Sequence, residues 1–99
     1  MMESIATNVP IGDEIARTFV VSNPLGLHMR PATTLANTAN AFRCDVWVTR
    51  GEHRVTAKSL ISLLSLSAES GAEVLVQTQG EDAAEAMVAL ADLFESGFE

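Results

Sequence analysis

Basic residues are scarce in this chain of 99 residues. It has six lysines and arginines against thirteen aspartates and glutamates, which gives a net charge of −7. Nucleic acid backbones attract basic surfaces, so this charge argues against nucleic acid as a partner. With so few cations, an arginine next to a potential functional residue is noticeable, and Arg30 is such a residue.

Cysteine and long apolar runs are scarce as well. The single cysteine, Cys44, cannot form an internal disulfide, which agrees with a reducing compartment, and we expect a cytoplasmic protein. No apolar run approaches the ~20 residues that a membrane span needs, and the acidic start, with Glu3, Asp13 and Glu14, is unlike a secretory signal. No Cys/His set has metal-ligand spacing and no Gly-rich nucleotide loop occurs, so we expect neither a metal nor a cofactor.

Hydrophobic patterning predicts one α+β domain at residues 16–99, preceded by a flexible leader at residues 1–15 that has no consistent period. Runs rich in β-branched residues or alternating in polarity predict strands at 17–22, 44–49 and 54–57, and "SGAEVLVQT" at 70–78 predicts a turn followed by a strand. Apolar residues at helical spacing predict helices from Ala32 to Phe42 and from Ala83 to Phe94, and "KSLISLLSLS" at 58–67 predicts a short helix between them.

The order of these elements is β-α-β-β-α-β-α. It favours a four-stranded antiparallel sheet with three helices on one face, an open-faced β-sandwich. Two helix starts have capping patterns: Ser59 is an expected N-cap, and Asp82 with Glu85 resembles a capping box.

The stretch "GLHMRPA", residues 26–32, offers chemistry because it stands where a loop becomes a helix. The first turn of a helix has unpaired N–H groups and a partial positive charge, and Pro31 is tolerated there because its missing N–H would be unpaired anyway. An anion held by His28 would meet those N–H groups, and the Arg30 guanidinium is shaped to clamp phosphate oxygens. Neutral imidazole is a competent nucleophile. On local grounds alone, an ordinary surface or capping histidine is the alternative.

"GLHMRPA" resembles the active-site segment of the HPr family, the histidine-containing phosphocarriers of the bacterial phosphoenolpyruvate-dependent sugar phosphotransferase system. The family pattern is Gly-Leu-His, a variable residue, then Arg-Pro-Ala, and every fixed position is matched. About thirty residues on, "AKSLISLLSL" resembles the family's second motif, a Lys-Ser-Leu/Ile helix start. "SLS" at 65–67 stands where that helix commonly ends in "SLG", and Met29 stands where the family usually has a small residue or threonine.

The resemblance implies that His28 takes a phosphoryl group from enzyme I through ring nitrogen Nδ1 and passes it to a histidine of an EIIA-type protein. Arg30 would neutralise the phosphate. Such a protein is a stoichiometric carrier rather than an enzyme, needs no cofactor, and is expected to be a monomer.

Ser59 has two interpretations. As an N-cap it stabilises a helix; by the resemblance it is also a regulatory site for an HPr kinase/phosphorylase, and a phosphate there would block transfer or recruit a regulator. The leucine-rich helix that follows cannot bury every apolar residue, so we expect a partner surface beside His28. Its candidate residues are Met29, Leu60, Ile61 and Leu64, with Ile61 and Leu64 as the exposed part and Leu60, with Leu63, closer to the core.

Two other functions stay open. One is a regulatory binding module of the nitrogen-related or catabolite-control branch, whose phosphorylation state partner proteins sense without sugar transport. The other is a small interaction domain in which His28 is incidental. Phosphorylation of His28 would exclude the second of these.

Overall fold

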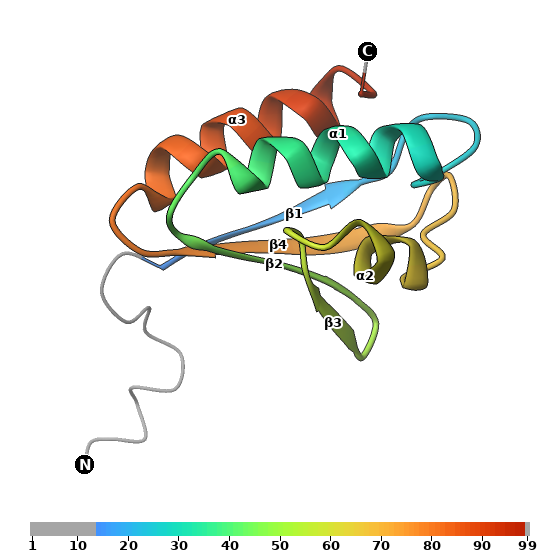
Figure 1. Cartoon of the computed structure of the whole chain (residues 1–99). Coiled ribbons are helices and arrows are strands. Elements are labelled where there is room, and N and C mark those ends of the chain that lie inside the picture. The colour runs from blue at the N-terminus through green and yellow to red at the C-terminus, as the bar shows by residue number, and fades with distance from the viewer. Residues whose placement is uncertain (1–13, 99) are drawn as a thin grey trace.

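The sheet is the layer on which the molecule is built (Figure 1). The structure is a computed structural model that describes residues 14–98. Its elements are β1 (Ile15–Val20), α1 (Met29–Asn40), β2 (Asp45–Arg50), β3 (His53–Thr56), α2 (Leu60–Ser65), β4 (Glu73–Gln79) and α3 (Ala83–Glu95). The strands form one sheet in the order β1-β4-β2-β3, with antiparallel neighbours throughout. The predicted α+β fold and element order are confirmed, while the first thirteen residues of the predicted leader lie outside the described residues.

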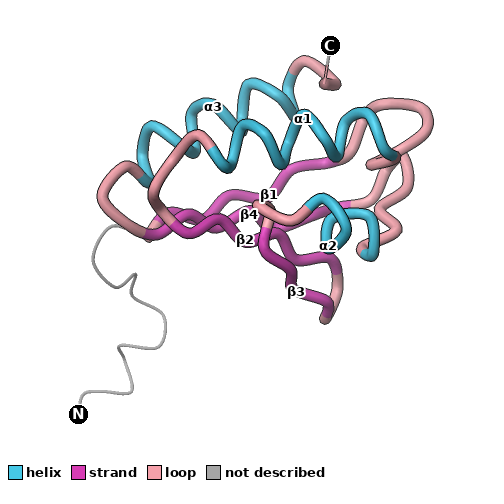
Figure 2. The backbone as a smooth tube through the Cα atoms, viewed as in Figure 1, coloured by secondary structure: helices cyan, strands magenta, loops and turns pink. Residues whose placement is uncertain are grey.

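Side chains that alternate along the strands divide the sheet into a covered and an open face. The covered face carries the buried apolar residues of the strands: Phe19, Val46, Val48, Val55, Val74 and Val76. Helices α1 and α3 run next to each other over this face, and α2 packs against α1 and β3 (Figures 1 and 2). Trp47 lies on the open face, as alternation predicts, with the Arg54 guanidinium 4.3 Å from its ring centroid.

Both long helices bury the apolar stripes that their sequences predict. In α1 the buried residues include Ala32, Leu35, Ala36 and Ala39, and in α3 they include Ala83, Met87, Leu90 and Phe94. The prediction was wrong at Phe42, which lies beyond the end of α1 in the turn to β2 and is only partly buried. Strand β1 begins two residues earlier than predicted, at Ile15, because its pairing with β4 extends to Thr78.

Helix α3 is not capped as its sequence predicts. The Asp82 side chain makes no capping bond at the start of α3. Its two carboxylate oxygens instead accept hydrogen bonds from the backbone N–H groups of Arg43 and Cys44, both at 2.9 Å. The carboxylate therefore ties the turn before β2 to the start of α3, and the predicted capping box with Glu85 was wrong.

Helix α2 is capped as predicted, because the Ser59 hydroxyl accepts a hydrogen bond from the Ser62 N–H at 3.2 Å. At the other end of α2, where the sequence has "SLS" in place of the common "SLG", Ser67 adopts a φ of +51°. Glycine populates this left-handed region at less cost than serine does. Arg50 donates from Nη1 to the carbonyl of Leu66 at 3.2 Å, which holds this end against β2. None of the helices within residues 14–98 has the length and apolarity of a membrane span.

Candidate functional site

The loop before α1 is fixed by a close approach of two backbones. Gly26 has a φ of +69°, and a Cβ atom there would lie 2.4 Å from the carbonyl oxygen of Ala68, so no other residue fits without displacing the backbone. The Leu27 N–H donates to that same oxygen at 2.8 Å, and the Leu27 side chain is buried. The Asn23 side chain also donates to the Gly26 carbonyl at 2.5 Å. These contacts place the next residue, His28, at the surface above a rigid support.

His28 is the N-cap of α1, yet its ring takes no part in capping. Its backbone is extended (φ −83°, ψ −168°), its carbonyl accepts the first helical bond from Ala32 at 3.0 Å, and its N–H donates to Gly26. The ring makes no capping hydrogen bond and is exposed. An N-cap histidine whose main chain is fully used and whose ring is free can act as a nucleophile without disturbing the helix.

The first turn of α1 supplies two N–H groups for an anion. The amides of Met29 and Arg30 have no acceptor within the helix, because no residue of the helix precedes them by four. Pro31 has no N–H and is buried, so it stabilises the turn without adding a donor. No acidic residue lies in this turn. A phosphate next to His28 would meet the positive end of the helix and the Arg30 guanidinium.

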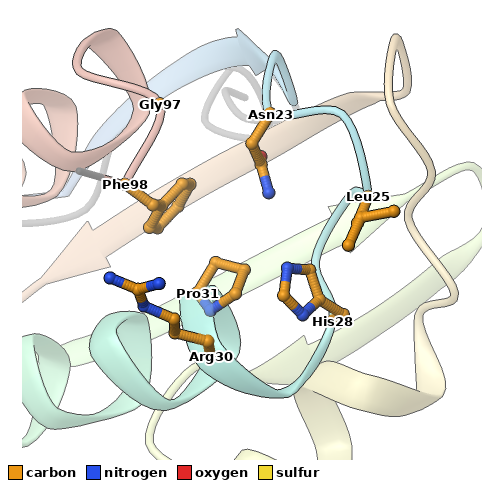
Figure 3. A pocket seen from close by; sticks show the side chains of 7 residues that line it. All are labelled: Asn23, Leu25, His28, Arg30, Pro31, Gly97 and Phe98. Carbon is orange, nitrogen blue, oxygen red and sulfur yellow. The ribbon is translucent and has the colours of Figure 1, made fainter.

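A shallow pocket of about 400 Å³ opens beside the His28 ring (Figure 3). Residues from the loop and the first turn of α1 make up most of its wall: Asn23, Leu25, His28, Arg30 and Pro31. Gly97 and Phe98, just after α3, complete it. Figure 3 shows the His28 ring on one side of Pro31 and the Arg30 guanidinium on the other, so both polar groups predicted from the sequence border one pocket.

Sequence reasoning missed the contribution of the last described residues. Phe98 lies 70 positions after His28, and no local pattern connects the two. The only hint in the sequence is the Gly-Phe pair directly after a helical repeat, which is typical of a helix end that turns back onto its own domain. Leu25, 75% exposed, was also missed, although it stands in the turn that the sequence predicts.

The residues of the predicted partner surface differ in exposure, and their role in binding stays a prediction. Ile61 is 74% exposed and Met29 57% exposed, while Leu63 is fully buried, as expected. Leu64 was predicted to be exposed, which is wrong: it is partly buried and packs on the core, as does Leu60. The reason is that α2 has only six residues and rests on both α1 and β3, so it covers apolar residues on more than one side.

Cys44 offers no second reactive site. It is 3% exposed, and burial, followed by its hydrogen bond to Asp82 and the Asp82 charge, raises the pKa of its thiol to about 11. The thiolate that nucleophilic chemistry needs is therefore negligible near neutral pH. Within residues 14–98, no group of three or more His, Cys, Asp or Glu side chains could hold a metal ion.

Together these features describe a small α+β domain that offers an exposed histidine, an arginine and helix N–H groups around an open hollow. The hollow is open to solvent, and His28, which borders it, is exposed. Such a site suits a group carrier that meets its reaction partners on the surfaces of other proteins.

Comparison with known proteins agrees with a group carrier. The family described as "PTS HPr component phosphorylation site" matches residues 15–96. The phosphocarrier protein HPr of Neisseria meningitidis serogroup A is 42% identical over 78 residues, covering 79% of this chain and 88% of that protein. The crystal structure of HPr from Thermoanaerobacter tengcongensis superposes with a TM-score of 0.83 at 38% identity, covering 85% of this chain and 94% of that one. A second structure from the same organism, an HPr dimer, gives a TM-score of 0.70 at 40% identity, covering 75% and 85%.

The chain therefore belongs to the HPr family of phosphocarrier proteins of the phosphotransferase system. Members of this family carry a phosphoryl group and are not catalysts in the usual sense.

Proposed function

We propose that His28 of this chain accepts a phosphoryl group from enzyme I and passes it to an EIIA-type protein. The observation that supports this is the free, exposed His28 ring at the N-terminus of α1, beside Arg30. The ring nitrogen Nδ1 would attack phosphorus, the bond to the donor imidazole of enzyme I would break, and the donor nitrogen would keep its electron pair. Onward transfer repeats the exchange with phosphorylated His28 as the donor: the histidine of the EIIA-type protein would attack phosphorus, the bond from Nδ1 of His28 would break, and Nδ1 would keep the electron pair.

Arg30 and the helix start would stabilise the phosphorylated state. The two N–H groups of Met29 and Arg30 and the guanidinium can oppose the charge of the phosphate on its different sides. Because the pocket is open and not enclosed, the phosphoryl group can be approached by a second protein while it is held. This is what a carrier needs: binding that is strong enough to hold the group and open enough to release it.

Partners would dock on the exposed apolar residues around His28. Leu25, Met29 and Ile61 are three large hydrophobic side chains that are more than half exposed, and they come from the loop before α1, from its first residue and from α2. Exposed apolar groups of this kind mark interaction surfaces.

The proposal also covers the compartment, the pathway and the oligomeric state of the protein. We propose that this chain acts in the cytoplasm, in sugar uptake, and as a monomeric carrier.

Ser59 would be a regulatory site. Its side chain is only partly buried, and its hydroxyl is at the start of α2, where added phosphate charge is favourable for the helix. Ile61, the most exposed candidate on α2, is two residues away. A phosphate at Ser59 would thus add negative charge at the border of the proposed docking surface.

Incubation with enzyme I and phosphoenolpyruvate, followed by intact mass, tests the function. The chain should gain one phosphoryl group that is labile in acid and stable in base, as expected of a phosphohistidine. Transfer onward to an EIIA-type protein should return the original mass. A chain that gains no mass, or that gains a phosphate stable in acid, would contradict the proposal.

A further inference from the structure

The C-terminal end of α3 is built to place an aromatic ring at the pocket. After the C-cap at Ser96, Gly97 and Phe98 both adopt left-handed backbone conformations, with φ of +69° and +65°. The Phe98 N–H donates to Leu93 at 2.8 Å and the Gly97 N–H donates to Phe94 at 3.3 Å. This is the Schellman arrangement, in which the residue after the glycine is directed back toward the helix.

The conformation of Phe98 itself needs an explanation. A glycine at the left-handed position is ordinary, but a bulky side chain in that region is an outlier that persists only where surrounding contacts favour it. Here the contacts are aromatic: the Phe98 ring meets Phe94 edge-on at 5.0 Å, and Phe94 stacks on Phe19 at 4.7 Å. The Phe98 ring is therefore anchored to the core from behind, while its free side borders the pocket.

The Phe98 and Arg30 side chains line the same pocket. Figure 3 shows the Phe98 ring and the Arg30 guanidinium on the same side of Pro31, away from the His28 ring. Arginine has many rotamers and loses much entropy when its guanidinium is fixed on a ligand. A rigid wall that excludes some of these rotamers beforehand lowers that loss, which is the general benefit of preorganisation.

We infer that Phe98 is a positioning residue for phosphoryl transfer, because it confines Arg30 to the pocket beside His28. The inference rests on the proposed function of His28 and adds the residue that prepares Arg30 for it. Phe98 makes no polar contact with the phosphate in this scheme, and its effect on transfer passes through Arg30 alone.

A double-mutant cycle tests this directly. Transfer rates from enzyme I would be measured for wild type, Phe98→Ala, Arg30→Ala and the double variant, with kcat and KM determined separately. We expect Phe98→Ala to lower kcat about three- to tenfold with little change in KM, within the range of coupling between residues that share a cavity. In the Arg30→Ala background the same substitution should have no further effect. Phe98→Tyr, which keeps the ring, should restore the wild-type rate.

A matched control and a second readout keep the test sharp. Phe42→Ala removes another partly buried phenylalanine, at the opposite end of α1, and should leave kcat unchanged. NMR relaxation of the Arg30 Nε–H in the unphosphorylated protein should show faster motion in Phe98→Ala than in wild type or Phe42→Ala. This readout needs no transfer and no partner.

Three outcomes would overturn the inference. Equal slowing by Phe98→Ala with and without Arg30 would show that the ring acts on the fold or on docking. Unchanged Arg30 motion in Phe98→Ala would show that the ring confines nothing. A wild-type chain that gains no phosphoryl group would overturn the proposed function together with this inference, whereas normal wild-type transfer with additive variants would overturn the inference alone.

Discussion

Two helix starts, those of α1 and α2, use the same position in opposite ways. Ser59, the N-cap of α2, has its hydroxyl bonded to the Ser62 N–H. His28, the N-cap of α1, leaves its ring unbonded and exposed. A cap that satisfies its own helix stabilises the fold, and a cap that leaves the helix start open keeps N–H groups and a side chain available for a ligand.

The two helices can differ in this way because they differ in length and in how many of their residues are buried. Helix α1 has twelve residues with a continuous buried stripe, so it is stable without a side-chain cap. Helix α2 has six residues, of which only Leu63 is fully buried, and it depends more on its cap and on the Arg50 bond at its end. The long helix α1 therefore stays folded while its N-cap side chain is left available for a reaction, whereas the short helix α2 needs its N-cap hydrogen bond.

The largest expected effect comes from removing the unbonded cap. His28→Ala should abolish the gain of a phosphoryl group from enzyme I, while the free energy of unfolding changes by no more than about 0.5 kcal/mol, since the exposed ring makes no capping bond. Intact mass and thermal melting measure the two quantities. Ser59→Ala is the matched cap variant and should still be phosphorylated. Undiminished phosphorylation of His28→Ala would disprove the role of this residue.

Removing the charge next to the unbonded cap comes second. Arg30→Ala should slow transfer by roughly ten- to hundredfold, the scale of one charge-assisted hydrogen bond, without a change in melting temperature. Arg30→Lys should recover part of the rate, because it restores the charge without the planar fork. Stopped-flow or quenched transfer assays measure this. Equal rates for all three proteins would mean that the backbone N–H groups suffice.

A third helix start, that of α3, allows a test by pH. Hydrogen bonds from backbone N–H groups hold the pKa of Asp82 below its ordinary value of 3.8. The Arg43 N–H has the largest effect, and the Cys44 N–H lowers the pKa further. The unfolded chain then binds the proton more tightly than the folded one, so this contribution is fully present above pH 3.8 and is lost as the pH falls through the lower, folded-state pKa.

The variant Asp82→Asn should therefore melt earlier than wild type at neutral pH, and the gap should close under acid conditions. Melting curves at several pH values measure this, with Asp92→Asn, an exposed carboxylate of the same helix, as the control. A gap that persists unchanged in acid would show that the carboxylate charge contributes nothing there.

The smallest effects belong to the bonded cap. Ser59→Ala should cost about 1 kcal/mol of unfolding free energy, which corresponds to a melting point lower by roughly 4–8 °C in a domain of this size. Ser59→Asp keeps an acceptor and adds charge at the helix start, so its melting point should hold or rise slightly.

Transfer to Ser59→Asp should show a raised apparent KM that salt alters, with a less affected maximal rate, because charges at the rim of an interface act through association. Steady-state transfer at two ionic strengths measures this. An early-melting Ser59→Asp would make the residue a cap only. A collapsed maximal rate at constant KM would place its effect in the chemistry at His28.

Much of this could be predicted from the sequence because it depends on neighbours along the chain. The period of apolar residues predicts which faces of α1 and α3 are buried, alternation predicts the open face of the sheet, and "GLHMRPA" predicts a histidine at a helix start. The resemblance to a family motif then indicates what such a histidine does.

The tertiary structure decided the features that depend on distant parts of the chain. Asp82 ties its carboxylate to the turn before β2 in place of its own helix, Leu64 is covered where the helical pattern predicts exposure, and Phe98 reaches the pocket from the other end of the chain. Periodicity reports which face of an element is apolar, but not what packs on it. What packs on each face is fixed only when the sheet brings distant parts of the chain together. The free energy of each of these contacts depends on groups that the local sequence does not contain.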